Sequence, residues 1–242
     1  MKLEEFCSRF QALQEQQPNT PILLDSGKQL MQELLRDPAW FAEFLQNHVA
    51  NAAFLADQHA SVFDNEIRLY RSPDKSFILL AYLWDRRGLC AVHDHSAWGL
   101  IGPILHPLRE VKYRRLDDGQ VEGYAHLEQA SDLALQPGEA GTVLPLDKGI
   151  HQTGAAGNHL TISLGAYGRS IRQGYIHFFD PGRKKFRRAT TRLMFKKVLA
   201  LRALASLEEV LGKRFLTSSL LESLPEDLIR EFRRISSSSN PI

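Results

Sequence analysis

Three histidines, two close together and one distant, have a spacing that could hold a metal ion. His93 and His95 are separated by one residue at the end of a segment rich in β-forming residues, so a strand would project both side chains from one face. His151 follows the turn-forming segment 145–149, which can direct its side chain inward. Three imidazoles on one side of a metal leave other coordination positions open for substrate, water or oxygen. The sequence therefore predicts a reaction site rather than a structural metal site.

The histidines lie in a region predicted to be β structure, with helices before and after it. Residues 1 to about 60 carry apolar side chains at helical spacing, broken at Pro18 and Pro21, with a second helix predicted from Gly27. From about 190 to 235 the helical spacing returns. Between about 64 and 186, short strands alternate with turns, which predicts a sandwich or barrel, and the histidine pair favours a jelly-roll barrel. The predicted strands are Phe77–Trp84, Leu89–His95, Gly99–Leu105, Arg109–Leu116, Val121–Gln129, Thr142–Leu144, Leu160–Tyr167 and Tyr175–Phe179.

Composition bounds the class of protein. The chain has 242 residues, of which 43% are hydrophobic and 24% charged, and this predicts a single domain spanning 1–242. The net charge of +2 argues against a nucleic-acid partner, and no apolar run is long enough for a membrane span. The basic run from Arg183 to Arg202 is interpreted as a solvated turn and helix face. With two unpatterned cysteines and no readable signal peptide, we expect a cytoplasmic protein.

Several motifs between about 64 and 186 resemble one family when they are considered together. They are HDHSAWG at 93–99, a strand ending in Trp84, Gly149-Ile150-His151, and Ser163–Gly168 leading into Phe179-Asp180-Pro181. Together they resemble the thiol dioxygenases, the cysteine dioxygenase and 3-mercaptopropionate dioxygenase family, most closely its bacterial mercaptopropionate branch. The resemblance implies a cupin barrel in which His93, His95 and His151 hold Fe(II). It also implies that O2 adds to a small thiol acid to give a sulfinic acid.

The sequence departs from the family pattern at two glycines. Gly99 stands where cupins usually supply an acidic ligand, so the metal would have three neutral ligands. The resemblance implies catalytic roles for Ser163 and Tyr167 in a Ser-x-His-x-Tyr relay, but Gly165 replaces its histidine. Water, His159 or His177 could fill this gap, or the activity has changed. Leu100 takes the place of the cysteine that cross-links to the tyrosine in animal-type enzymes, so no thioether is predicted.

Substrate binding is predicted to involve two arginines and an aromatic wall. The resemblance implies an arginine or glutamine on an early strand that orients the substrate carboxylate, and Arg68 and Arg71 lie in that region. An arginine fork suits a carboxylate. Trp98 is predicted to form a wall of the site, together with Trp84 and Tyr82. Asp94, between the two ligands, is interpreted as a turn residue or an outer hydrogen-bond acceptor.

Two other functions remain open at this stage. One is a different three-histidine cupin oxygenase, for example an enzyme that cleaves a carbon–carbon bond of a diketone. The other is a non-catalytic cupin that holds a metal as a sensor, which the glycine at position 165 would favour. The sequence leaves the identity of the thiol and the oligomeric state open.

Overall fold

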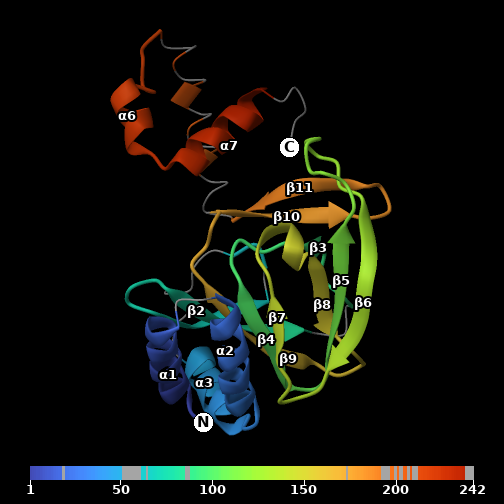
Figure 1. Ribbon diagram of the computed structural model, residues 1–242. Coiled ribbons are helices and arrows are strands. Elements are labelled where there is room, and N and C mark those ends of the chain that lie inside the picture. The colour runs from blue at the N-terminus through green and yellow to red at the C-terminus, as the bar shows by residue number, and fades with distance from the viewer. Residues whose placement is uncertain are drawn as a thin grey trace.

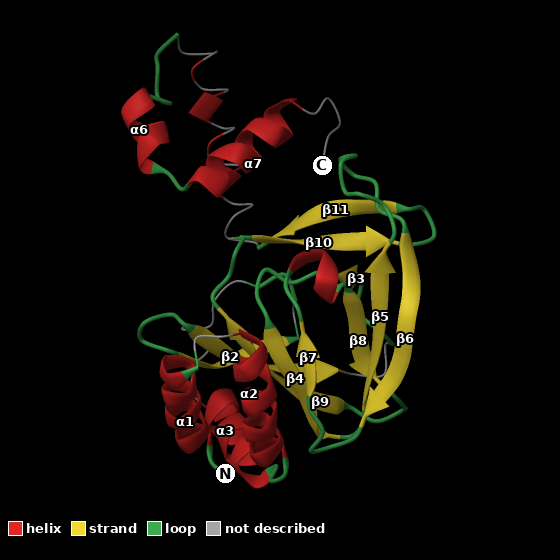
Figure 2. Cartoon of the chain, in the orientation of Figure 1, coloured by secondary structure: helices red, strands yellow, loops and turns green. Residues whose placement is uncertain are grey.

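The computed structural model describes residues 1–17, 20–50, 61–63, 65–84, 88–172, 174–191 and 212–237, together with 197–198, 201, 204–205 and 208. Two antiparallel sheets form the centre of the molecule, with the N-terminal helices against one sheet and the C-terminal helices beyond an end of the other (Figure 1). Figure 2 shows that the strands lie between these two helical parts. The predicted fold class is confirmed as a mainly β jelly-roll barrel of two antiparallel sheets, with helices before and after it.

The N-terminal helices cover the outer face of one sheet. Phe6, Phe10 and Leu34 are buried against sheet residues such as Leu79 and Leu100. The second helix begins at residue 20, not at residue 27 as predicted, because a proline is tolerated in the first turn, where an N–H has no intrahelical partner. Pro18 and residues 51–60 lie outside the described residues. The helices are α1 (Leu3–Gln16), α2 (Thr20–Leu35) and α3 (Ala39–Ala50).

Strands distant in the sequence are neighbours in both sheets, as in a jelly roll. The five-stranded sheet has the order β1 (Glu66–Arg71), β2 (Phe77–Trp84), β9 (Thr161–Gly168), β4 (Gly99–Leu105) and β7 (Gly141–Val143). The six-stranded sheet has the order β11 (Lys185–Thr190), β10 (Tyr175–Asp180), β3 (Val92–His93), β8 (His151–Ala155), β5 (Leu108–Arg115) and β6 (Leu127–Leu135).

Three predicted segments differ from the structure. The strand predicted from residue 121 begins at Leu127, because the Asp117 carboxylate accepts the backbone N–H groups of Gly119 and His126 and holds a loop. The strand predicted over 89–95 is reduced to β3, since the backbone N–H of Asp94 turns to the carbonyl of His177. Part of the basic run, expected to be turn and helix, is strand β11, which pairs with β10 along its whole length.

The apolar core is divided by the sheets into layers. The largest layer lies between the N-terminal helices and the five-stranded sheet. A second lies between the sheets and contains Leu80, Tyr82, Trp84, Ile101 and Leu108. A third covers the outer face of the six-stranded sheet, where the 116–126 loop packs against it through Ala125. The middle layer is the one that surrounds the three histidines.

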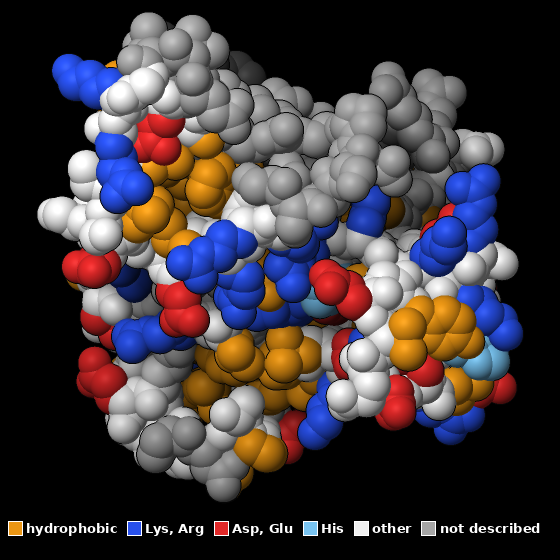
Figure 3. All heavy atoms as spheres, turned by 90° about the horizontal axis from the view of Figure 1, so that it is seen from above, with side chains coloured by type: hydrophobic (Ala, Val, Ile, Leu, Met, Phe, Trp, Pro, Cys, Tyr) orange, Lys and Arg blue, Asp and Glu red, His pale blue; other side chains and the backbone are white. Residues whose placement is uncertain are grey.

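The C-terminal helices α6 (Ser218–Ser223) and α7 (Glu226–Ser237) have a small core of their own, which includes Val198, Leu201 and Leu228. An ion pair of 3.4 Å between Arg188 of β11 and the buried Glu231 of α7 connects them to the barrel. Figure 3, viewed from the side of these helices, shows Lys and Arg side chains gathered between two hydrophobic patches. Among the described helices, none is both long and apolar enough to cross a membrane.

Candidate metal centre

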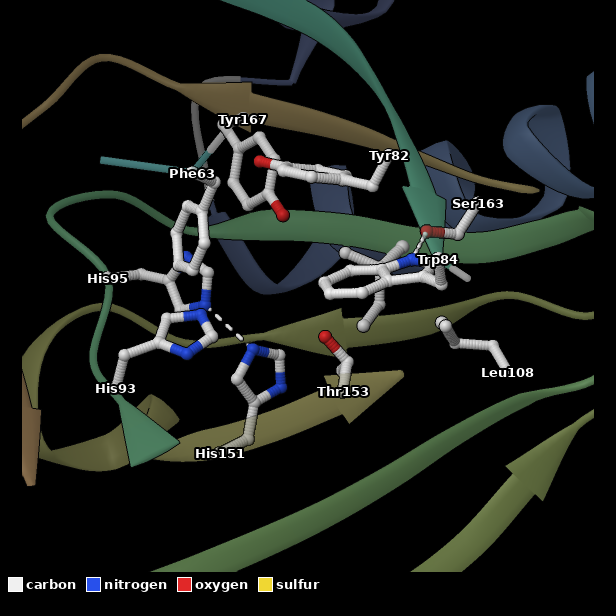
Figure 4. A pocket seen from close by; sticks show the side chains of 11 residues that line it. Phe63, Tyr82, Trp84, His93, His95, Leu108, His151, Thr153, Ser163 and Tyr167 are labelled. Atoms are coloured by element: carbon white, nitrogen blue, oxygen red, sulfur yellow. Dashed lines mark hydrogen bonds between the residues drawn. The ribbon is translucent and has the colours of Figure 1, made fainter. Parts of the chain in front are cut away.

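The three predicted histidines converge on one point between the sheets. His93 and His151 are direct partners in the register of β3 and β8, whereas His95 comes from the loop after β3 rather than from the strand itself. One ligand atom from each lies within 4.8 Å of the others. The Nε2 atoms of His95 and His151 are 2.8 Å apart, close enough to share an ion at the roughly 2.0–2.1 Å usual for metal–nitrogen bonds (Figure 4). The group could therefore hold a metal.

The position of His151 depends on a close backbone turn. A 3-10 turn, η1 (Leu146–Gly149), ends two residues before it. A Cβ added to Gly149 would lie 1.7 Å from the carbonyl oxygen of Leu144, so only glycine allows this approach. The predicted role of the 145–149 segment in directing His151 inward agrees with this geometry.

Hydrogen bonds fix the ring orientation of two of the three histidines. The Nδ1 of His93 lies 2.9 Å from the carbonyl oxygen of Ala91, and the Nδ1 of His151 lies 2.7 Å from Oε1 of Glu110. Both partners accept a hydrogen bond, so in each ring Nδ1 carries the hydrogen and Nε2 presents a lone pair. These residues fit a metal ion, because Nε2 of His93 and of His151 is left unprotonated and able to bind one.

Burial keeps two of the imidazoles neutral. The pKa values of His95 and His151 lie well below the ordinary value, first because burial disfavours the cation and second because the other imidazoles repel a charge. Burial also opposes protonation of His93, but contacts with the Cys90 thiol and the Ala91 carbonyl raise its pKa. Neutral imidazole is the form that binds a metal.

A small pocket opens beside the histidines, with about 320 Å³ of empty space when its open side is included. Tyr82 and Trp84, two of the three predicted walls, face into it (Figure 4). The described side chains that line it are Phe63, Tyr82, Trp84, His93, His95, Ile101, Leu108, His151, Thr153, Ser163 and Tyr167.

Tyr167 explains both glycine departures from the family pattern. A Cβ on Gly99 would lie 2.6 Å from Cδ1 of the tyrosine ring, and a Cβ on Gly165 would lie 2.5 Å from Cε2. The ring therefore occupies the space beside both positions, and it stacks on the His95 ring with 5.4 Å between centroids and 12° between planes. The gap left by the missing relay histidine is filled by the tyrosine itself.

The other predicted relay residues have different partners from those expected. Ser163 lines the pocket and accepts a 2.8 Å hydrogen bond from Nε1 of Trp84. The His159 ring lies tilted against the His106 ring, with 4.9 Å between ring centroids. His177 contacts Asp94 on the outer side of the six-stranded sheet. Neither of these histidines fills the gap at Gly165, so that alternative is wrong.

The two predicted substrate arginines lie on one side of β1. Arg68 is opposite Leu80 and, after a bulge, Arg71 is opposite Ile78. Opposite residues share a face of a sheet, and both partners belong to the layer between the sheets, so the arginines rise from the barrel-facing side. Arg68 is half-buried and Arg71 is exposed. Neither belongs to the described lining of the pocket at the histidines.

Trp98 and Asp94 face away from the pocket. Trp98 packs over Gly168 and lies 6.2 Å from the Phe10 ring centroid, in the layer beneath the N-terminal helices, and it is not among the described lining residues. Asp94 accepts hydrogen bonds from Nη2 of Arg172 at 2.6 Å and from the backbone N–H of His177 at 2.8 Å. It therefore anchors the ligand loop from outside, as its interpretation as an outer acceptor predicted.

Glu110 is the residue of the site that the sequence analysis missed. Its side chain is 1% exposed, although it lies in a strand that otherwise looks like a charged surface strand, LREVKYRR. Period-two alternation from the buried Leu108 would have placed it on the inward face. The alternation was present in the sequence, but the other charged residues of the strand made it resemble a surface strand.

No family model matches the sequence. Among solved structures, the chain is similar to a cupin-like protein from Thermotoga maritima, with 11% identity over 47% of this chain and 74% of that chain and a TM-score of 0.34. A cupin 2 conserved barrel domain protein from Salinispora arenicola has 12% identity, coverage of 46% and 81%, and a TM-score of 0.32. The hydroquinone 1,2-dioxygenase PnpCD has 9% identity, coverage of 46% and 72%, and a TM-score of 0.33.

Proposed function

We propose that the chain is an Fe(II)-dependent thiol dioxygenase that converts a small thiol acid, of the cysteine or 3-mercaptopropionate type, into its sulfinic acid. The observation that carries the proposal is a group of three histidines that converge between the sheets, with Tyr167 stacked on the ring of His95, at the positions where the family motifs occur. The reaction balances as R–SH plus O2 giving R–SO2H: both oxygen atoms end on sulfur, whose oxidation supplies the electrons that reduce O2.

His93, His95 and His151 would hold the iron. Bound Fe(II) supplies open positions at which a thiolate and O2 can meet, and its charge favours loss of the thiol proton. Because the ligands are neutral, an anionic sulfur is the natural complement of the site. Tyr82, Trp84 and Phe63 exclude water from the reacting groups.

Tyr167 is proposed to hold a proton at its hydroxyl beside the reacting sulfur. Burial is the first cause that raises its pKa, so the phenol stays protonated at neutral pH and can donate a hydrogen bond. Ser163 supports the same wall by accepting the Trp84 N–H. Arg68 and Arg71, on the barrel-facing side of β1, are proposed to attract the substrate carboxylate.

One observation favours a second candidate. The described lining of the pocket contains no Lys, Arg, Asp or Glu, which suits an uncharged substrate as well. A three-histidine oxygenase that cleaves a neutral diketone is therefore the alternative.

Oxygen uptake by the iron-loaded full chain tests both candidates. The protein is purified without oxygen, loaded with Fe(II), and supplied with cysteine, 3-mercaptopropionate, cysteamine or acetylacetone. Thiol-dependent uptake with a sulfinic acid detected by mass spectrometry supports the proposal. Uptake with the diketone alone supports the second candidate. Full iron occupancy without uptake on any substrate overturns both and favours a metal-holding sensor.

A further inference from the structure

The buried carboxylate of Glu110 lies directly behind His151, one of the three proposed metal ligands, and its burial requires an explanation. Glu110 is 1% exposed, and removing a carboxylate from water costs several kcal/mol unless charge or hydrogen bonds compensate. Its two compensating contacts are Nδ1 of His151 at 2.7 Å and Nζ of Lys112 at 3.5 Å. Lys112 is itself 38% exposed, so it compensates Glu110 only in part.

The contact with His151 transfers charge toward the proposed metal position. A neutral imidazole has one N–H, and the carboxylate requires that it be on Nδ1, so Nε2 is the coordinating atom. A carboxylate that accepts this N–H makes the imidazole a stronger donor than a neutral partner does. The corresponding N–H of His93 donates its hydrogen bond to the uncharged backbone carbonyl of Ala91. The two histidines are therefore unequal as ligands.

The neighbouring lysine is placed to oppose this effect. In the pairing of β5 and β8, Lys112 is directly opposite His151. Glu110 lies two residues before Lys112, and therefore on the same face of the strand. Lys112 also donates to the carbonyl oxygen of Thr142 at 3.2 Å, which holds its ammonium group near the carboxylate. One negative and one positive side chain thus act on the same imidazole from one strand.

We infer that Glu110 is a positioning residue: through its hydrogen bond with His151 it supplies negative charge to a metal that has no acidic ligand, because position 99 is a glycine. Lys112 reduces the amount of this charge that reaches the metal. The inference rests on the metal site of the proposed function but not on thiol chemistry. The inference assigns opposite effects on the metal to Glu110 and Lys112, two inward-facing residues of one strand. A purely structural role would not produce effects of opposite sign.

The test compares Glu110→Gln and Lys112→Gln in the full chain, with Fe(II) as the probe. Glutamine keeps an acceptor for the His151 N–H and removes the charge. Glu110→Gln is expected to weaken anaerobic Fe(II) binding about 10-fold to 100-fold and to raise the Fe(III)/Fe(II) midpoint potential. Lys112→Gln is expected to tighten binding and lower the potential, by less, because Lys112 is half-exposed. Asp132→Asn, which removes a carboxylate paired with Arg109 on the barrel exterior, is the matched control.

Shifts of the same sign in both variants, or a Glu110→Gln shift no larger than that of Asp132→Asn, would overturn the inference. If Glu110→Gln fails to fold, the Lys112→Gln variant alone tests the inference. An unchanged midpoint potential in that variant would show that these charges do not act on the metal. Wild-type protein that binds no Fe(II) overturns the inference and the proposed function together. If the wild-type protein binds iron, and the two variants shift affinity and potential in opposite directions as expected, but no thiol is oxidised, only the proposed function is rejected.

Discussion

The two sheets contribute different chemistry to the same pocket. The six-stranded sheet provides the strand-borne ligands His93 and His151 and the buried Glu110, and is the wall that can hold a cation. The five-stranded sheet provides aromatic rings and hydroxyl groups, among them Tyr82 and Tyr167, which carry no charge. Under the proposed function, metal binding and substrate binding thus fall to separate sheets. Substitutions in the first wall should change metal content, and substitutions in the second should change turnover or stability with the metal retained.

The largest expected effect comes from removing a ligand. His151→Ala should lose nearly all bound iron while the barrel remains folded, because the cavity left by one imidazole borders an existing pocket. His93→Ala should behave in the same way. Elemental analysis and circular dichroism measure the two quantities. His159→Ala, which removes an exposed histidine outside the site, is the control and should keep its iron. Full occupancy in either ligand variant would remove that histidine from the ligand set.

The next largest effect is expected from restoring the family's relay residue. Gly165→His places a Cβ only 2.5 Å from Cε2 of Tyr167, so the ring must shift from its stack on His95. We expect a loss of about 1–3 kcal/mol in the free energy of unfolding and little remaining activity. Gly157→His, at a glycine with open space around it, is the matched control. Increased thiol oxidation in Gly165→His would show that the relay, and not the tyrosine stack, limits the reaction.

The sequence predicted the parts of this site that depend on local pattern. The spacing of His93 and His95 and the turn before His151 indicated the three histidines that lie together, although His95 comes from the loop after β3 and not from the strand that was predicted. Strands such as Phe77–Trp84 were predicted with their observed ends, because an apolar run followed by a turn defines a strand by itself. These features need no knowledge of which strands are neighbours.

The remaining features depend on pairing between distant strands. The inward position of Glu110 follows from the register of β5 with β8, which brings residues about forty apart in the sequence into contact. The departure at Gly165 looked like a missing function, but in the structure it is the space that Tyr167 requires. Trp98 is a residue type that often lines pockets. It lies just before β4, however, and packs in the layer beneath the N-terminal helices. Alternation along β5 indicates the inward side for Glu110, but the pairing with β8 is what brings it to His151, whereas Gly165 and Tyr167 lie two residues apart in β9.

Tyr167→Phe tests whether the aromatic wall acts in turnover. The variant keeps the ring that stacks on His95 and removes the hydroxyl. Because burial holds the phenol in its protonated form, we expect a proton donor to be lost and kcat/KM to fall about 100-fold, with iron content unchanged. Steady-state oxygen uptake and elemental analysis on the same sample check this. An equal loss of iron and activity would mean that the ring or its hydroxyl supports the metal, which would break the separation between the walls.

The smallest expected effect is that of Ser163→Ala. This change leaves the Trp84 N–H without its 2.8 Å acceptor in a buried place, which should cost about 1–3 kcal/mol in unfolding free energy measured with urea. Ser8→Ala, on the exposed side of α1, controls for the loss of a hydroxyl and should change the free energy by a few tenths. Iron content should stay at the wild-type level, because Ser163 belongs to the five-stranded wall. If iron is lost instead, the aromatic wall helps to hold the histidines in place, and the two sheets are not separable in function.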